Sequence, residues 1–112
     1  MNFREYQEET KKVRRSSEYS MTGGAIAYQT LGLVGEAGEV AEKIKKVIRD
    51  KGGIVDDETK KGIMKELGDV LWYLTQLATE LGVTLDETAE MNLEKVRGRL
   101  ENGKIHGDGD DR

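Results

Sequence analysis

The chain has no proline in its 112 residues, and its few glycine-rich breaks separate long stretches in which apolar side chains recur every three or four positions. Proline is the strongest interruption of a helix, and this spacing gathers the apolar side chains on one helical face. The pattern therefore predicts an all-α protein with short connections between helices. We expect helices over about residues 3–15, 25–50 and 57–81, and a fourth from residue 85 up to the tail.

Helix ends are marked by capping residues. Asn2 and Asp56 are predicted N-caps, and "TLDE" (84–87) is a capping box that opens the fourth helix. "KGG" (51–53) supplies glycines that end the second helix. The stretch "SSEYSMTGG" (16–24) predicts a loop or a loosened helix end.

Three of the predicted helices carry an apolar face, from which we expect a four-helix-type bundle completed by homodimerisation. The second helix contributes Val34, Ala37, Val40, Ala41, Ile44, Val47 and Ile48; the third contributes Ile63, Leu67, Val70, Leu71, Leu74, Leu77, Ala78 and Leu81; and the fourth contributes Ala89, Leu93, Val96 and Leu100. Trp72 points away from this face of the third helix, which suggests a subunit interface or a ligand wall. A chain of this length has a modest core, so oligomerisation would add to its stability.

Composition predicts one helical domain over 1–101 and a Gly/Asp-rich tail over 102–112. Without cysteine the chain has no disulfide and no thiolate metal site, and a cytoplasmic protein fits. No apolar run reaches the length of a membrane span, so we expect no membrane association. The net charge is −4, whereas a protein that binds a nucleic acid polymer typically carries a basic surface, so we expect no such partner.

Two acidic pairs border the apolar faces of consecutive helices: Glu36 with Glu39, and Glu66 with Asp69. If the helices pack through those faces, four carboxylates converge and need a cation. Oxygen ligands favour Mg²⁺, with Mn²⁺ as a possible substitute. Gly32, in turn, would leave room for a ligand or, alternatively, allow close packing of the helices. The competing interpretation is a solvated acidic face with ordinary salt pairs along the helix.

The fourth helix carries Asn92, Lys95 and Arg99 on one strip, where an amide and two cations suit phosphate oxygens or a sugar hydroxyl. His106, the single histidine, lies in the tail and is expected at the surface. No Walker A motif and no serine-hydrolase motif is present.

"GLVGEAGEVAEKIKK" (32–46), "KELGDVLWYL" (65–74) and "NLEK" (92–95) together resemble the MazG-like all-α nucleoside triphosphate pyrophosphohydrolases. The resemblance spans about residues 26–100. It implies conversion of a nucleoside triphosphate to monophosphate and pyrophosphate, with Mg²⁺ held by Glu36, Glu39, Glu66 and Asp69. Positions Lys43, Tyr73, Asn92 and Lys95 would contact phosphates or sugar.

The resemblance also implies a homodimer or homotetramer that completes the helical core, and a house-cleaning role in the nucleotide pool. Among the carboxylates, Glu39 is the first choice for the base that accepts a proton from water. We expect an untethered tail; the alternative is a tail in which Lys104 or Arg112 folds over a phosphate. The alternatives are a phosphoribosyl-ATP pyrophosphohydrolase-like enzyme and a non-catalytic helical module that binds nucleotides or a protein partner.

Overall fold

The computed structural model describes residues 1–14, 24–103 and 106–110, and in these ranges every regular element is a helix. The helices are α1 (Phe3–Val13), α2 (Gly24–Lys51), α3 (Asp57–Glu80) and α4 (Leu85–Glu101). The predicted all-α class and the four helices are confirmed, with ends that differ by one or two residues. The loop predicted over 16–24 lies outside the described residues, apart from Gly24.

The predicted caps form as hydrogen bonds. Asn2 Oδ1 accepts from the Glu5 backbone N–H at 2.8 Å, and Asp56 Oδ1 accepts from the Thr59 N–H at 2.7 Å. In the capping box, Thr84 Oγ1 accepts from the backbone N–H three residues later at 3.0 Å. Each cap satisfies an N–H that would otherwise lack a partner in the first helical turn.

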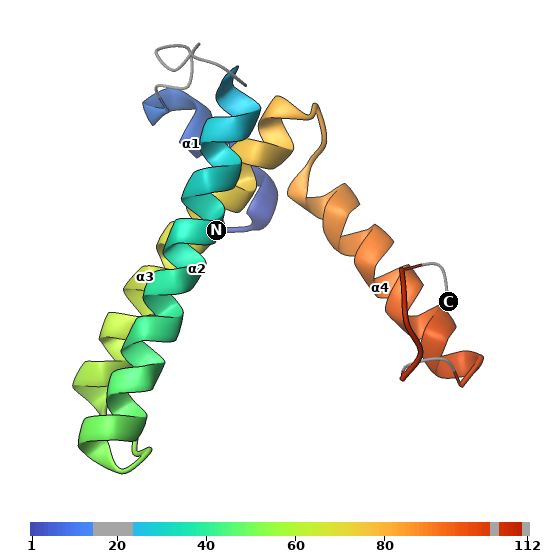
Figure 1. Cartoon of the computed structure of the whole chain (residues 1–112). Coiled ribbons are helices and arrows are strands. Elements are labelled where there is room, and N and C mark those ends of the chain that lie inside the picture. Colours follow the sequence, from blue (N-terminus) through green and yellow to red (C-terminus); the bar gives the residue numbers. More distant parts are fainter. Residues whose placement is uncertain (15–23, 104–105, 111–112) are drawn as a thin grey trace.

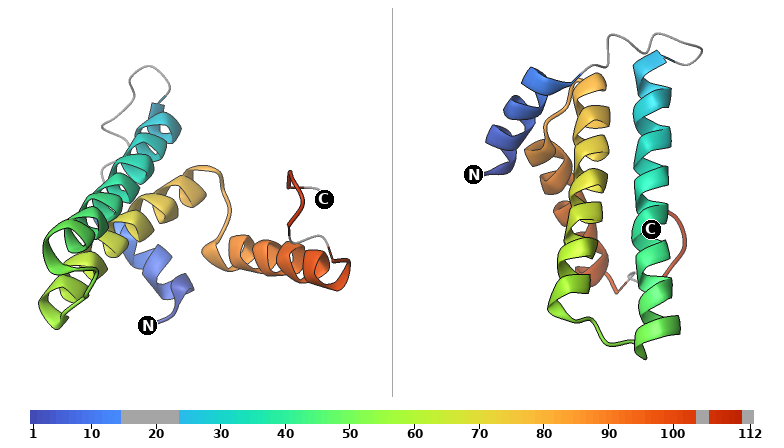
Figure 2. Two further views of the ribbon diagram at one scale, coloured as in Figure 1. Left: turned by 60° about the horizontal axis from the view of Figure 1, so that its bottom comes forward. Right: turned by 90° about the vertical axis from the view of Figure 1, so that its left-hand side faces the viewer.

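A long antiparallel hairpin of α2 and α3 is the main feature of the fold (Figures 1 and 2). Gly52 and Gly53 make its turn with φ of 60° and 79°, a conformation that strains residues with a Cβ. Helix α1 packs against α3 and the beginning of α4, and α4 then diverges from the hairpin. The hairpin therefore sets the relative positions of the two acidic pairs.

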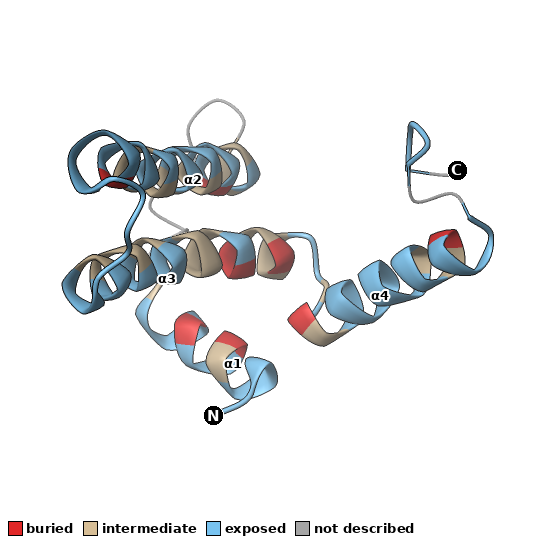
Figure 3. Cartoon of the chain, turned by 90° about the horizontal axis from the view of Figure 1, so that it is seen from below, coloured by how far each residue is buried: buried red, intermediate tan, exposed pale blue. Residues whose placement is uncertain are grey.

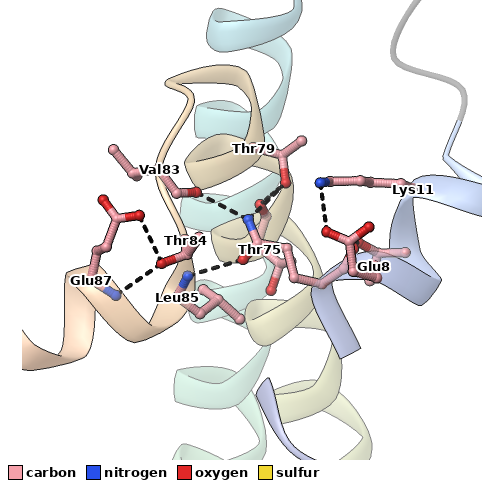
Figure 4. A network of polar contacts seen from close by, with 10 residues as sticks. Glu8, Lys11, Thr75, Thr79, Val83, Thr84, Leu85 and Glu87 are labelled. Carbon is pink, nitrogen blue, oxygen red and sulfur yellow. Dashed lines mark hydrogen bonds and ion pairs between the residues drawn. The ribbon is translucent and has the colours of Figure 1, made fainter. Parts of the chain in front are cut away.

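Gln7 joins α1 to the connection between α3 and α4 (Figure 4). Its Nε2 donates to Thr79 Oγ1 at 3.1 Å and to the Val83 carbonyl at 3.0 Å, while its Oε1 accepts from the Leu85 N–H at 3.0 Å. The side chain is only 4% exposed. Both ends of this amide are paired, so Gln7 has a structural role.

The apolar faces predicted to form a core are largely exposed in the single chain (Figure 3). Among the described apolar residues only Val47, Ala78 and Leu85 are buried. Val34 and Leu100 remain 66% and 71% exposed, so the expected inner faces of α2 and α4 are not covered within one chain. A four-helix bundle is therefore not closed within one chain, because α4 diverges from the hairpin, and its expected completion by a second copy stays a prediction.

The described part of the tail contacts α4. Asp110 Oδ1 lies 3.2 Å from Lys95 Nζ, and Arg99 Nη2 donates to the Asp110 carbonyl at 2.6 Å and to the Gly109 carbonyl at 3.2 Å. The expectation of an untethered tail is therefore wrong for these residues. Lys104 and Arg112 lie outside the described residues.

Candidate metal centre

Three carboxylates meet in the middle of the α2–α3 hairpin. One oxygen each from Glu36, Glu66 and Asp69 lies within 4.8 Å of the other two. Glu36 comes from α2, and the other two occupy consecutive turns of α3. The packing of the two helices thus brings together residues 30 or more positions apart, as the sequence predicts.

The electrostatics of the cluster act on Glu36. Burial raises the pKa of Glu36, and the negative charges of Asp69, Glu66 and Glu39 raise it further. A cation bound among these oxygens would offset the like charges around Glu36. A donor set made only of carboxylate oxygens suits a hard divalent ion such as Mg²⁺ or Mn²⁺.

Glu39 and Lys43 continue the site along α2. Glu39 is exposed and lies outside the group of three, but its charge reaches Glu36. Lys43 Nζ lies 3.7 Å from Glu66 Oε1, at the edge of the cluster. An ammonium beside carboxylates of this kind can bind the phosphate oxygens of a metal-bound ligand.

Tyr73 of α3 lies against Gly32 of α2, and Gly32 precedes Glu36 by one helical turn. A Cβ on Gly32 would come within 2.3 Å of the Tyr73 ring, so the ring occupies the space that glycine leaves. Tyr28 completes the arrangement, with its ring centroid 6.4 Å from that of Tyr73. The space at Gly32 is therefore taken by a side chain of α3, which favours the interpretation of close helix packing over that of room for a ligand.

Two predicted substrate residues lie on α4. Asn92 is exposed, and Lys95 is paired with Asp110. No described contact joins either residue to the acidic cluster, since α4 diverges from the hairpin. Their role stays a prediction.

Sequence reasoning missed three side chains near this centre. Tyr6 of α1 has a pKa raised by burial and by the charge of Asp69, which places it near the cluster. Gln29 and Gln76 are buried between the long helices and line a common cavity. The sequence spacing could have identified the two glutamines. Gln29 precedes Glu36 by seven residues and Gln76 follows Asp69 by seven, a spacing that keeps residues on one helical face.

The chain is thus an all-α protein whose antiparallel helical hairpin carries a cluster of three carboxylates. Residues 27–103 match the model of the MazG nucleotide pyrophosphohydrolase domain, and the chain belongs to this family. A curated relative, the Gene 37 protein of Mycobacterium phage L5, is 48% identical over 87 residues, which cover 78% of this chain and 76% of the relative. No solved structure matches the chain.

None of the helices in the described ranges combines the length and apolarity needed to cross a membrane.

Proposed function

We propose that this protein is a Mg²⁺-dependent pyrophosphohydrolase that converts a nucleoside or deoxynucleoside triphosphate and water to the monophosphate and pyrophosphate. The observation that carries the proposal is the cluster of Glu36, Glu66 and Asp69 in a chain of the MazG family. A role in clearing non-standard or surplus nucleotides fits this chemistry.

The carboxylates fit the metal by the nature and crowding of their oxygens. Glu36, Glu66 and Asp69 would hold Mg²⁺, with Glu39 as a fourth ligand or as the base. When bound, the ion supplies Lewis-acid stabilisation of phosphate charge and a lower pKa for water.

The protein's own groups account for binding and proton transfer. Lys43 projects its ammonium at the edge of the cluster, where it would neutralise charge on the departing pyrophosphate. Glu39, exposed beside the cluster, would accept the proton of the water that attacks the α-phosphorus. Tyr73, fixed against Gly32, would border the sugar, and Asn92 and Lys95 would serve the phosphates or sugar after the tail contact at Lys95 is released.

We also propose that two copies of the chain associate to complete the core, as a dimer or a dimer of dimers. Leu31 and Ile48 of α2 are 74% and 67% exposed, and Met64 of α3 is 62% exposed. Apolar exposure of this extent along a hairpin is typical of a face that packs against another subunit. Size-exclusion chromatography with light scattering at micromolar concentration is expected to show a dimer or larger, and a strict monomer would refute this part.

The reaction is tested by measuring pyrophosphate and monophosphate release from a panel of canonical and modified nucleoside triphosphates, with Mg²⁺ and with EDTA. Glu66→Gln is expected to lower turnover by at least about a hundredfold, since it removes one charged ligand of the cluster. The matched control is Glu90→Gln, at an exposed glutamate of α4.

Release of single phosphate, or equal activity in EDTA, would refute the proposed reaction. Full activity in Glu66→Gln would remove the cluster from the mechanism.

A further inference from the structure

The chain contains three glutamines, Gln7, Gln29 and Gln76, and all three are buried. Gln7 has both ends of its amide paired, as described above. Gln76, only 1% exposed, has neither its Nε2 nor its Oε1 hydrogen-bonded, and the Oε1 of Gln29, a residue 3% exposed, is also unpaired. Burying an amide without a partner costs about 1–3 kcal/mol per unsatisfied group, so these two residues need an explanation that Gln7 does not.

Gln29 and Gln76, which carry the three unpaired amide atoms, line the same cavity, which has a volume of about 180 Å³. Its walls include the rings of Tyr28, Trp72 and Tyr73. A cavity of about 150 Å³ is large enough to hold a benzene ring. A pocket with aromatic walls and buried polar groups without partners has the composition of a site for a flat, polar ring.

The cavity lies in register with the acidic cluster along the hairpin. Residues of α2 and α3 that lie opposite each other form successive levels along the hairpin. Gln29 and Gln76 form the first level, and Glu36 and Asp69 form the next. Lys43 and Gly62 form the third, where Lys43 Nζ would lie 3.9 Å from a Cβ on Gly62. Each level is seven residues further along α2 and seven further back along α3, as their antiparallel arrangement requires (Figure 2).

Seven residues of α-helix span about 10.5 Å, a separation that a nucleoside triphosphate can bridge between its base and its phosphates. The order of the three levels therefore matches the order of groups in a nucleoside triphosphate. The glutamine level would hold the base, the carboxylate level the α-phosphate with its cation, and the lysine level the outer phosphates.

The unpaired amide atoms restrict which nucleobase can bind in the cavity. Two amide oxygens require two N–H groups, and the Gln76 amide nitrogen requires an acceptor beside them. An exocyclic amino group next to a ring nitrogen supplies all three. Uracil and thymine offer one ring N–H between two carbonyls, which would leave one glutamine oxygen unpaired. Of the bases with an amino group, cytosine has a single ring of the size that the cavity holds.

On the basis of the proposed function, we infer that the cavity between Gln29 and Gln76 is the nucleobase pocket and that it selects cytosine nucleotides. Trp72 and Tyr28 contact the faces of the ring, and the two amides bind its amino edge.

The test compares kcat/KM for dCTP, dUTP, dATP and dGTP in the wild type, Gln76→Met and Gln29→Met, with Mg²⁺ present. The wild type is expected to prefer dCTP over dUTP by at least about a hundredfold, because a site built to hydrogen-bond a substrate rejects an analogue that leaves its buried groups unpaired. Each methionine variant is expected to lose most of that preference. Gln76→Met is expected to keep or raise the thermal midpoint of unfolding, since an amide with both ends unpaired is replaced by an apolar side chain of similar length.

A second measurement does not depend on turnover. Trp72 is the sole tryptophan, so its fluorescence reports ligands in this cavity. Titration with cytidine monophosphate in EDTA is expected to change the emission of the wild type, and uridine monophosphate and the Gln76→Met variant are expected to give at most about a tenth of that affinity.

The outcomes separate the two proposals. Metal-dependent hydrolysis that depends on Glu66 but shows no base preference and no effect of either glutamine variant would overturn the pocket and leave the reaction in place. A fluorescence response selective for cytidine without hydrolysis of any nucleotide would support the pocket and overturn the reaction. A preference for dUTP, or for both purines over dCTP, would overturn the assignment of the base.

Discussion

Gly32→Ala is the substitution whose effect the structure defines most sharply. The added Cβ would lie 2.3 Å from two carbons of the Tyr73 ring and 2.7 Å from a third. The ring packs between α2 and α3 and must move, and overpacking of this kind costs about 1–3 kcal/mol. Alanine returns up to about 1 kcal/mol through its higher helix propensity. The net expectation is a loss of about 1–2 kcal/mol in the free energy of unfolding.

Gly35→Ala is the matched control, one turn further along the same helix. No described atom lies within 4 Å of a Cβ at Gly35, so only the propensity term applies and the variant is expected to gain up to about 1 kcal/mol. The two variants should differ by about 2 kcal/mol, measured by urea unfolding in EDTA at one protein concentration.

A double variant identifies the cause. In a Tyr73→Leu background the alanine at position 32 is expected to stabilise, because the ring that it meets is gone. A Gly32→Ala variant as stable as Gly35→Ala would refute the packing of Tyr73 on α2, and a loss that persists without the ring would assign it to another neighbour.

The remaining predictions concern the hydrogen bonds of Gln7, the Asp56 cap and the carboxylate cluster. Gln7→Met is expected to lower the free energy of unfolding by about 2–4 kcal/mol through the loss of three hydrogen bonds, measured by urea unfolding; an unchanged value would show that these hydrogen bonds do not form. Hydrogen bonds from Thr59 and Lys51 lower the pKa of Asp56 from 3.8 to about 2. Its ionised form therefore stabilises the fold above pH 3.8, and this stabilisation is lost as the pH falls toward 2. Asp56→Ala should accordingly lower the thermal midpoint at pH 7 but not near pH 2, and an equal loss at both would contradict the assignment. Glu36→Gln is expected to raise the midpoint of the metal-free protein and to abolish the further increase that Mg²⁺ gives the wild type; equal Mg²⁺ stabilisation in both would exclude Glu36 as a ligand.

The local part of the fold could be predicted from the sequence. Absence of proline and a helical period gave the helices, and Asn2, Asp56 and Thr84 gave their starts, because a cap depends on residues within one turn. The convergence of Glu36 with Glu66 and Asp69 was also predictable, since each borders the apolar face through which α2 and α3 pack.

The rest was decided by tertiary structure. Helical period marks an apolar face but not the partner that covers it, and only the path of α4 shows that Val34 and Leu100 stay exposed in one chain. An isolated glutamine carries no sign of its role, and only the packing of α2 on α3 distinguishes the paired Gln7 from Gln29 and Gln76. The sequence by itself determined which segments are helices and which carboxylates share a face, because both are set by neighbours in the chain. Burial and hydrogen-bond partners depend on residues distant in sequence, so only the tertiary structure decided what Gly32 accommodates and which amides are left for a ligand.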